Sequence, residues 1–287
     1  MGCVRVDADK IVYSAGFATE KNTFSVIQDF EVTTIPRATE KAAMRFLKEN
    51  YPTGTHMVRS CTREHVSHSI HIINTTINRI QKRYPDHELI VYLTESTGVY
   101  NFRNDIATTL GYKANRKGMS RPIYYEELRR HMLSKFDCIV CNTAEADDWV
   151  IVDYEPGDVI AGVDKDLLQF PGVHYNYDKD IEKVVTVEEG NRNFFHQVMY
   201  GDEIDNIPGM RHWCKPRAWG PIKTSKLIAN CVLPLEYYYA ILDGYKKTLI
   251  NEKFDEDVFR DRFEEQCKLL WLWRYEGDTW NWTKMVE

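Results

Sequence analysis

Apolar residues follow two alternating patterns over roughly the first two thirds of the chain. Short uninterrupted apolar runs, typical of strands buried on both faces of a parallel sheet, occur at 3–6, 89–93, 138–141 and 159–163. Between them, apolar residues recur at helical spacing in 38–49, 65–83, 126–136 and 144–152. Strands that alternate with helices predict an α/β fold with a mostly parallel central sheet flanked by helices.

The pattern changes near residue 191, where helical spacing begins to dominate. We expect helices at 194–200, 224–231, 235–242 and 257–273, with a basic segment rich in Gly and Pro between the first two. The sequence therefore predicts two domains, an α/β domain at 1–190 and a helical subdomain with a C-terminal tail at 191–287.

Charge is unevenly distributed along the 287 residues. The net charge of −6 argues against a nucleic-acid partner, but basic residues cluster in 113–130, and 211–226 contains no acid at all. The apolar runs are too short to span a bilayer, so we expect no membrane partner. Seven scattered cysteines favour a reducing cytoplasm. Cys138 and Cys141 form a C-x-x-C inside a predicted strand, which favours a structural role over a zinc site.

Acidic residues follow each of the four predicted strands. They are Asp7, Glu95, Glu145, Asp147, Asp148, Asp164 and Asp166, with Asp9 beside the first. Any one of them alone would be interpreted as a helix cap or a solvated loop residue. The carboxyl ends of parallel strands meet at one crevice, however, and so many carboxylates there would repel one another. Divalent cations relieve this repulsion, and oxygen ligands favour Mg²⁺ or Mn²⁺, with room for two ions about 3.5–4 Å apart.

A second acidic pair lies in 201–209. Asp202 and Asp205 are three residues apart, so we expect them to share one face of a helix. A glycine turn then opens the predicted helix that carries Lys223 and Lys226, where backbone amides can meet phosphate.

These stretches, taken in order from residue 7 to about 228, resemble the motifs of the 5′-nuclease superfamily, and most of all its phage T7-type 5′-exonucleases. The likeness is carried by seven stretches: Val6 to Asp9, Asn101 to Arg103, Tyr112 to Lys117, Glu145 to Asp148, Asp164 to Asp166, Gly201 to Gly209 and Gly220 to Lys226. The resemblance implies metal-site roles for Asp7, Glu95, Glu145, Asp147, Asp148, Asp164, Asp166, Asp202 and Asp205. It implies catalytic roles for Lys113 and Arg116, and DNA-binding roles for Arg103, Lys117, Lys223 and Lys226. It also implies a PIN-like core and a helix–three-turn–helix that holds duplex DNA.

The sequence departs from the family pattern at three places. Glu95 stands where the family usually has Asp, and reaches one methylene further. The segment 209–220 is longer than usual and carries Trp213 and Trp219, which bears on the K⁺ site that the family often builds there. The stretch between Lys117 and Glu126 is short, so we expect any helical arch over the site to be small.

The resemblance implies a Mg²⁺-dependent 5′-3′ exonuclease or 5′ flap endonuclease, monomeric, acting on duplex DNA with a 5′ end or flap, or on an RNA–DNA hybrid. A haloacid-dehalogenase-type phosphatase is an alternative, since Asp7-x-Asp9 and Gly201-Asp202-x-x-Asp205 are among its ingredients. A DNA-binding protein that has lost its metal ions is another.

Overall fold

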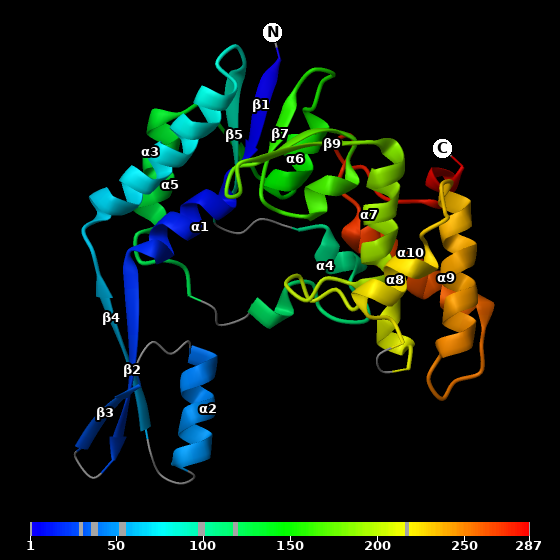
Figure 1. Ribbon diagram of the computed structural model, residues 1–287, viewed down its shortest axis with the longest axis horizontal. Helices are drawn as coiled ribbons and strands as arrows, with labels where there is room; N and C mark the ends of the chain where they lie inside the picture. Colours follow the sequence, from blue (N-terminus) through cyan, green and yellow to red (C-terminus); the bar gives the residue numbers. More distant parts are fainter. Residues whose placement is uncertain are drawn as a thin grey trace. The chain divides into compact units, whose positions relative to one another are not determined.

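A six-stranded sheet in the order β6-β5-β1-β7-β8-β9 forms the centre of the fold (Figure 1). This computed structural model describes residues 2–28, 31–35, 40–51, 56–96, 101–116, 120–215 and 218–286. The strands are β1 (Cys3–Asp7), β5 (Glu88–Thr94), β6 (Cys138–Cys141), β7 (Val159–Ala161), β8 (Gly172–Asn176) and β9 (Ile181–Val185). Neighbouring strands are parallel except for β9, which runs antiparallel to β8. The predicted α/β class with a mostly parallel central sheet is confirmed.

Strand β1 lies between β5 and β7, with Val6 opposite both Val91 and Ala161. Val4 and Val6 are completely buried, as expected for a strand covered on both faces. The four strands predicted from apolar runs coincide with β1, β5, β6 and β7. Strands β8 and β9 were not predicted, because neither contains a continuous apolar run.

The helices agree with the predicted pattern apart from their ends. They are α1 (Asp9–Ala18), α2 (Glu40–Asn50), α3 (Val66–Arg83), α4 (Arg103–Ile106), α5 (Tyr125–Lys135), α6 (Ala146–Val152), α7 (Val187–Tyr200), α8 (Pro221–Leu227), α9 (Pro234–Thr248) and α10 (Glu256–Leu270), with 3-10 turns η1 (Ala114–Arg116), η2 (Asp166–Gln169), η3 (Met210–Trp213) and η4 (Trp282–Met285). Helices α1 and α4 were not predicted. Helix α7 begins earlier than expected because Thr186 and Glu189 form a capping box.

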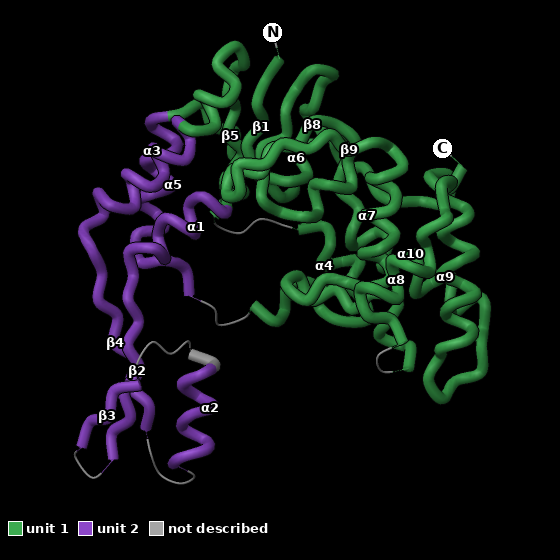
Figure 2. Tube along the Cα trace, viewed as in Figure 1, with its two compact units in different colours: residues 1–9, 79–119, 136–287 green, residues 10–78, 120–135 purple. Residues whose placement is uncertain are grey.

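Two compact units make up the chain (Figure 2). The first contains residues 1–9, 79–119 and 136–287, and the second contains residues 10–78 and 120–135. The predicted boundary near residue 191 lies inside α7, within the first unit. The sheet and helices α7–α10 thus belong to one compact unit. Within it, α7 packs closely on η2, since a Cβ added at Gly190 would lie 2.7 Å from the Gln169 carbonyl oxygen.

The second unit contains a three-stranded antiparallel sheet that the sequence did not predict. Its order is β3-β2-β4, with β2 (Glu20–Gln28), β3 (Glu31–Ile35) and β4 (His56–Arg63). Phe24, Val26 and Ile35 pack with Ala43 of α2 to form a small core. The helical pattern around 38–49 was therefore interpreted correctly, and the strands around it were missed because their exposed residues interrupt the apolar alternation.

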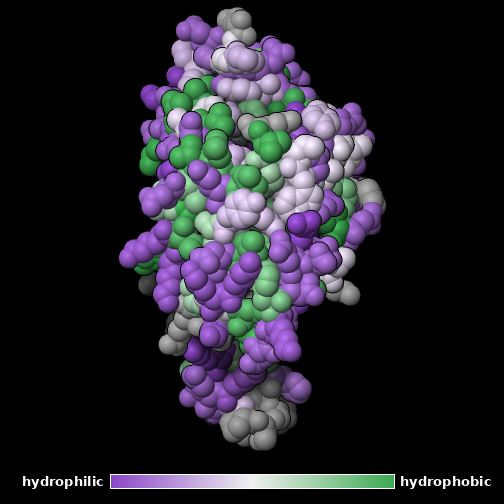
Figure 3. Space-filling view, turned by 90° about the vertical axis from the view of Figure 1, so that its right-hand side faces the viewer, coloured by the Kyte–Doolittle hydropathy of each residue, from purple (hydrophilic) through white to green (hydrophobic). Residues whose placement is uncertain are grey.

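Helices α7, α9 and α10 enclose an aromatic core in the first unit. Phe195 stacks on Tyr237 with 4.8 Å between ring centroids, and Phe263 packs against Trp280 at 5.8 Å. On the face shown in Figure 3, hydrophobic side chains lie in groups separated by hydrophilic ones. Within the described ranges, no helix is both long and apolar enough to cross a bilayer.

Candidate active site

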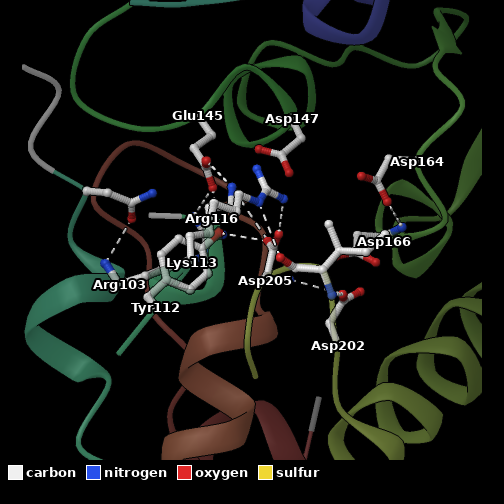
Figure 4. A network of polar contacts seen from close by, with 12 residues as sticks. Arg103, Tyr112, Lys113, Arg116, Glu145, Asp147, Asp164, Asp166, Asp202 and Asp205 are labelled. Carbon is white, nitrogen blue, oxygen red and sulfur yellow. Dashed lines mark hydrogen bonds and ion pairs between the residues drawn. The ribbon is translucent and has the colours of Figure 1, made fainter. Parts of the chain in front are cut away.

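Acidic side chains gather at the carboxyl edge of the central sheet, in the first unit. Asp7 is the last residue of β1, Glu95 follows β5, Glu145 precedes α6 in the loop after β6, and Asp164 follows β7. Figure 4 shows Glu145 and Asp147 near Lys113 and Arg116, and Asp164 beside Asp166. The parallel register of the sheet brings these segments together.

Asp7 is 8% exposed. Burial, followed by the charges of Asp9 and Asp164, raises the pKa of the Asp7 carboxyl to about 8. Asp9 itself opens α1 and accepts a hydrogen bond from the backbone N–H of Thr94 at 3.1 Å. Acids from the ends of two strands are therefore close enough to repel one another, which is the condition that a bound cation would relieve.

Glu145 caps the first turn of α6. It accepts hydrogen bonds from the Tyr112 hydroxyl at 2.7 Å and from the Lys113 ammonium. Burial alone would raise the pKa of Glu145, but Lys113 and Arg103 lower it to about 2. Two residues later, burial and then the charges of Asp148 and Glu145 raise the pKa of Asp147 well above its usual value. At the start of α6, neighbouring cations thus keep Glu145 ionised, whereas burial and neighbouring acids favour the protonated form of Asp147.

Asp148 and Arg103 are buried and pair with each other. Arg103 is 2% exposed and Asp148 is fully buried, and they form a bidentate ion pair with 2.8 Å and 2.9 Å between nitrogen and oxygen. Asp148 also accepts the backbone N–H groups of Trp273 at 3.1 Å and Glu145 at 3.3 Å. Both Asp148 oxygens accept hydrogen bonds from protein donors, and the Arg103 guanidinium is buried. The metal-site role of Asp148 and the DNA-binding role of Arg103 stay predictions of the resemblance.

Lys113 and Arg116 lie among the acids. Lys113 has a positive φ of 53°, uncommon for a residue other than glycine, and its backbone N–H donates to the Asp205 carbonyl at 2.8 Å. Its ammonium nitrogen lies 3.5 Å from a carboxylate oxygen of Asp205, which also pairs with Arg116. Tyr112 is a site residue to which the sequence analysis gave no role, because a tyrosine next to basic residues is easily interpreted as packing. Its hydroxyl lies 2.7 Å from a Glu145 oxygen and 3.0 Å from an Asp205 oxygen, so its one proton is shared between the two carboxyl groups.

Asp164 and Asp166 enclose Lys165 in the turn after β7. The Asp166 N–H donates to Asp164 at 3.0 Å, and the Gln197 amide of α7 donates to the Asp166 carboxylate. Burial, then the charges of Asp164 and Asp202, raises the pKa of Asp166 to about 7. Gln197 was also missed, since only the fold brings α7 beside η2.

Asp202 and Asp205 lie in a tight turn and not on the helix that their spacing predicted. Asp202 and Ile207 exchange two backbone hydrogen bonds of 2.7 and 2.8 Å, and the Asp202 carboxylate accepts the N–H of Ile204 at 2.8 Å. Gly201 has a φ of 78°, and an added Cβ there would lie 2.4 Å from the Ile207 carbonyl oxygen. The positive φ of Gly201 ends α7 at Tyr200. Asp202 and Asp205 therefore do not continue the helix, and the prediction that they share a helix face is wrong.

Four predicted site residues remain, Glu95, Lys117, Lys223 and Lys226. Glu95 is partly buried and accepts the backbone N–H of Ser96 at 2.6 Å. Lys223 and Lys226 are exposed on α8, and Lys117 lies outside the described residues. Cys138 and Cys141 are the ends of β6, as expected for structural cysteines.

Among the described residues, no three acidic, histidine or cysteine side chains converge closely enough to hold one metal ion together. Glu145, Asp205 and Asp202 are instead paired with Lys113, Arg116 and Lys165. The chemistry of the donors still fits a hard divalent cation, because all are carboxylates. Burial, and then neighbouring carboxylates, raise the pKa of Asp7, Asp147 and Asp166, so each holds a proton that a bound cation would displace.

Comparison with known proteins supports the fold. No protein-family model matches the sequence, and a comparison with curated proteins finds no match. Among solved structures, the T5 5′-exonuclease with divalent zinc ions bound is similar, with a TM-score of 0.51 and 15% identity over 94% of both chains. The chain therefore shares the fold of that exonuclease over most of its length.

Proposed function

We propose that this protein is a Mg²⁺-dependent 5′-nuclease that hydrolyses DNA phosphodiester bonds. The observation that carries the proposal is the position of Lys113 and Arg116 against Glu145 and Asp205, beside the acids at the carboxyl edge of the sheet. Cations next to acids with raised pKa values suit a phosphate and metal ions bound together. The similar fold of the T5 5′-exonuclease supports the same reaction class.

Two groups of acids would hold the metal ions. Glu145, Asp147 and Asp205 lie around Lys113 and form one group, and Asp164, Asp166 and Asp202 lie around Lys165 and form the other. The charges of both Asp164 and Glu145 act on Asp7, and Glu95, which follows β5, belongs to the same proposal. A bound divalent ion supplies Lewis-acid activation of water and stabilises charge on the phosphate oxygens. The acids themselves fix its position, and Tyr112 holds Glu145 and Asp205 in place through its hydroxyl.

Lys113 and Arg116 would bind the phosphate whose bond is cut. In the structure both are paired with carboxylates, so a phosphate would replace Glu145 and Asp205 as their partner. Burial lowers the pKa of Lys113, but the charges of Glu145 and Asp205 raise it above its usual value, which keeps the ammonium protonated. A permanent positive charge at this point stabilises the extra negative charge of the transition state.

The C-terminal helices would hold the duplex without reading its sequence. Lys223 and Lys226 lie exposed on α8, which begins at a Gly-Pro turn, and they suit contacts to the phosphate backbone. We propose that the protein acts as a monomer on duplex DNA with a 5′ end or flap. Lys117 belongs to the same proposal through the resemblance.

The phosphatase alternative is not favoured by the structure. In that class the Gly-Asp pattern follows a strand, whereas Gly201 and Asp202 follow helix α7. Asp9 is the first residue of α1 and caps the end of β5 through Thr94.

The test is digestion of a 5′-labelled duplex, a 5′ flap and an RNA–DNA hybrid side by side, with Mg²⁺ and with EDTA. The proposal expects Mg²⁺-dependent release of label from the duplex or the flap. Binding without cutting would indicate a protein that only binds DNA. Turnover of a small phosphomonoester in place of DNA would indicate a phosphatase.

A further inference from the structure

We give the name C-terminal strap to residues 269–274, which are the last two residues of α10 and the four that follow it. The helix ends at Leu270, and Trp271 has φ −68° and ψ 124°. The strap's backbone is hydrogen-bonded to buried side chains from distant parts of the first unit. The side chains that make these contacts belong to, or pair with, the segments that carry the two groups of acids.

Arg103 and Asp148 join the strap to the start of α6. The Arg103 guanidinium donates to the carbonyl oxygens of Leu269 and Trp271, both at 3.0 Å. It also donates to both carboxylate oxygens of Asp148. Asp148 accepts the N–H of Trp273 on one oxygen and the N–H of Glu145 on the other. The ion pair therefore fixes the helical turn that carries Glu145 and Asp147.

Gln169 joins the same strap to the turn that begins at Asp166. Its amide donates to the Leu270 carbonyl at 2.9 Å and accepts the Leu272 N–H at 3.2 Å. Gln169 is 3% exposed and is the last residue of η2, which starts at Asp166. One segment of backbone thus holds the second group of acids as well.

We propose that the C-terminal strap, through Arg103, Asp148 and Gln169, is a positioning element that sets the two acidic groups for metal binding. The three side chains are too buried to touch substrate, so they act through the acids they hold. Outer residues that orient metal ligands commonly change metal affinity by about 10- to 100-fold when they are removed. The inference rests on the proposed function.

The chain offers a matched control. Arg5 and Asp158 form a second buried ion pair, 2.6 Å apart, and Asp158 also accepts the backbone N–H of Cys3 at 2.7 Å. Asp158 precedes β7, so this pair lies at the amino edge of the sheet, away from the acids. Replacing its carboxylate tests the loss of a buried ion pair alone.

The experiment measures Mn²⁺ binding to the full-length protein without DNA, by electron paramagnetic resonance, together with the melting temperature. Asp148→Asn and Gln169→Leu are expected to weaken Mn²⁺ binding about 10-fold or more. Asp158→Asn is expected to lower the melting temperature and leave Mn²⁺ binding unchanged. If Asp148→Asn does not fold, Gln169→Leu decides the question.

Variants that bind Mn²⁺ like the wild type would overturn the positioning role, as would an Asp158→Asn variant that is weakened equally. Wild-type protein that binds no Mn²⁺ and cuts no DNA would instead overturn the proposed function. The two failures are therefore distinguishable.

Discussion

The ammonium nitrogen of Lys165 lies 2.6 Å from a carboxylate oxygen of Asp202, so the turn after β7 neutralises an acid of the turn after α7. Burial alone would raise the pKa of Asp202, but Lys165 lowers it below its usual value. A metal ion bound by Asp164, Asp166 and Asp202 would share these acids with the ammonium. The Lys165 ammonium would thus compete with a metal ion for the Asp202 carboxylate.

Lys165→Met is expected to lower the Mg²⁺ concentration that gives half-maximal cleavage, because the competing charge is gone. Lys165→Arg keeps the charge and should behave like the wild type. The measurement is the initial rate on a labelled duplex over a Mg²⁺ series. A higher Mg²⁺ requirement in the Met variant would show that Lys165 supports the site.

The free energy of unfolding without metal is expected to fall as pH rises from about 4 to about 8. Asp7 and Asp166 have pKa values of about 8 and about 7 in the folded protein, both above the unfolded value near 4. The folded state therefore binds more protons in this range, and each group contributes a slope of up to about 1.4 kcal/mol per pH unit. Denaturant titrations in EDTA measure the slope.

Added Mg²⁺ should remove this pH dependence above about pH 7, since a bound cation keeps the carboxylates ionised in the folded state. The same titrations of the Asp7→Asn variant should show a shallower slope in EDTA. A wild-type stability that rises between pH 5 and 8 in EDTA would contradict the account of these two acids.

Lys113→Met and Arg116→Met are each expected to reduce the cleavage rate by about 10²- to 10³-fold with little change in DNA binding, since their charge acts mainly in the transition state. Lys247→Met is the control, because Lys247 is exposed on α9 and pairs only with its helix neighbour Asp243 among the contacts described. Single-turnover rates and binding in EDTA separate the two effects. Equal loss of binding and rate would assign these residues to ground-state binding.

Lys223→Gln and Lys226→Gln are expected to weaken duplex binding to a similar extent for every sequence, and each to reduce the slope of log affinity against log salt by about one. Fluorescence anisotropy over a salt series measures the slope. An unchanged slope in both variants would place the duplex elsewhere on the protein.

Apolar runs predicted the strands that deliver Asp7, Glu145 and Asp164, because a strand buried on both faces leaves a clear signature. Strands β8 and β9 lack that signature, with polar residues such as His174, Glu182 and Lys183 among them. The antiparallel sheet of the second unit was missed for the same reason. Strands β3, β4 and β9 are exposed over most of their length, whereas β8 is partly buried but contains no apolar run.

The roles of Asp147 and Asp148 could not be separated from the sequence. They are adjacent acids in one helical turn, and only the fold brings Arg103 and the Trp273 N–H to Asp148. Similarly, the spacing of Asp202 and Asp205 fits a helix, and the bonds to Ile207 that make a turn are a tertiary outcome. Charge and spacing predict that acids gather, and partners far away in the chain decide which of them remain available.

The most direct test of the account is a crystal of the protein soaked in Mn²⁺, with ions located by anomalous scattering. The account predicts ion peaks in contact with Asp7, Glu145 or Asp147 and with Asp164 or Asp166, at the carboxyl edge of the sheet. No ion at these carboxylates, with Lys113 and Lys165 still paired to Glu145 and Asp202, would contradict it.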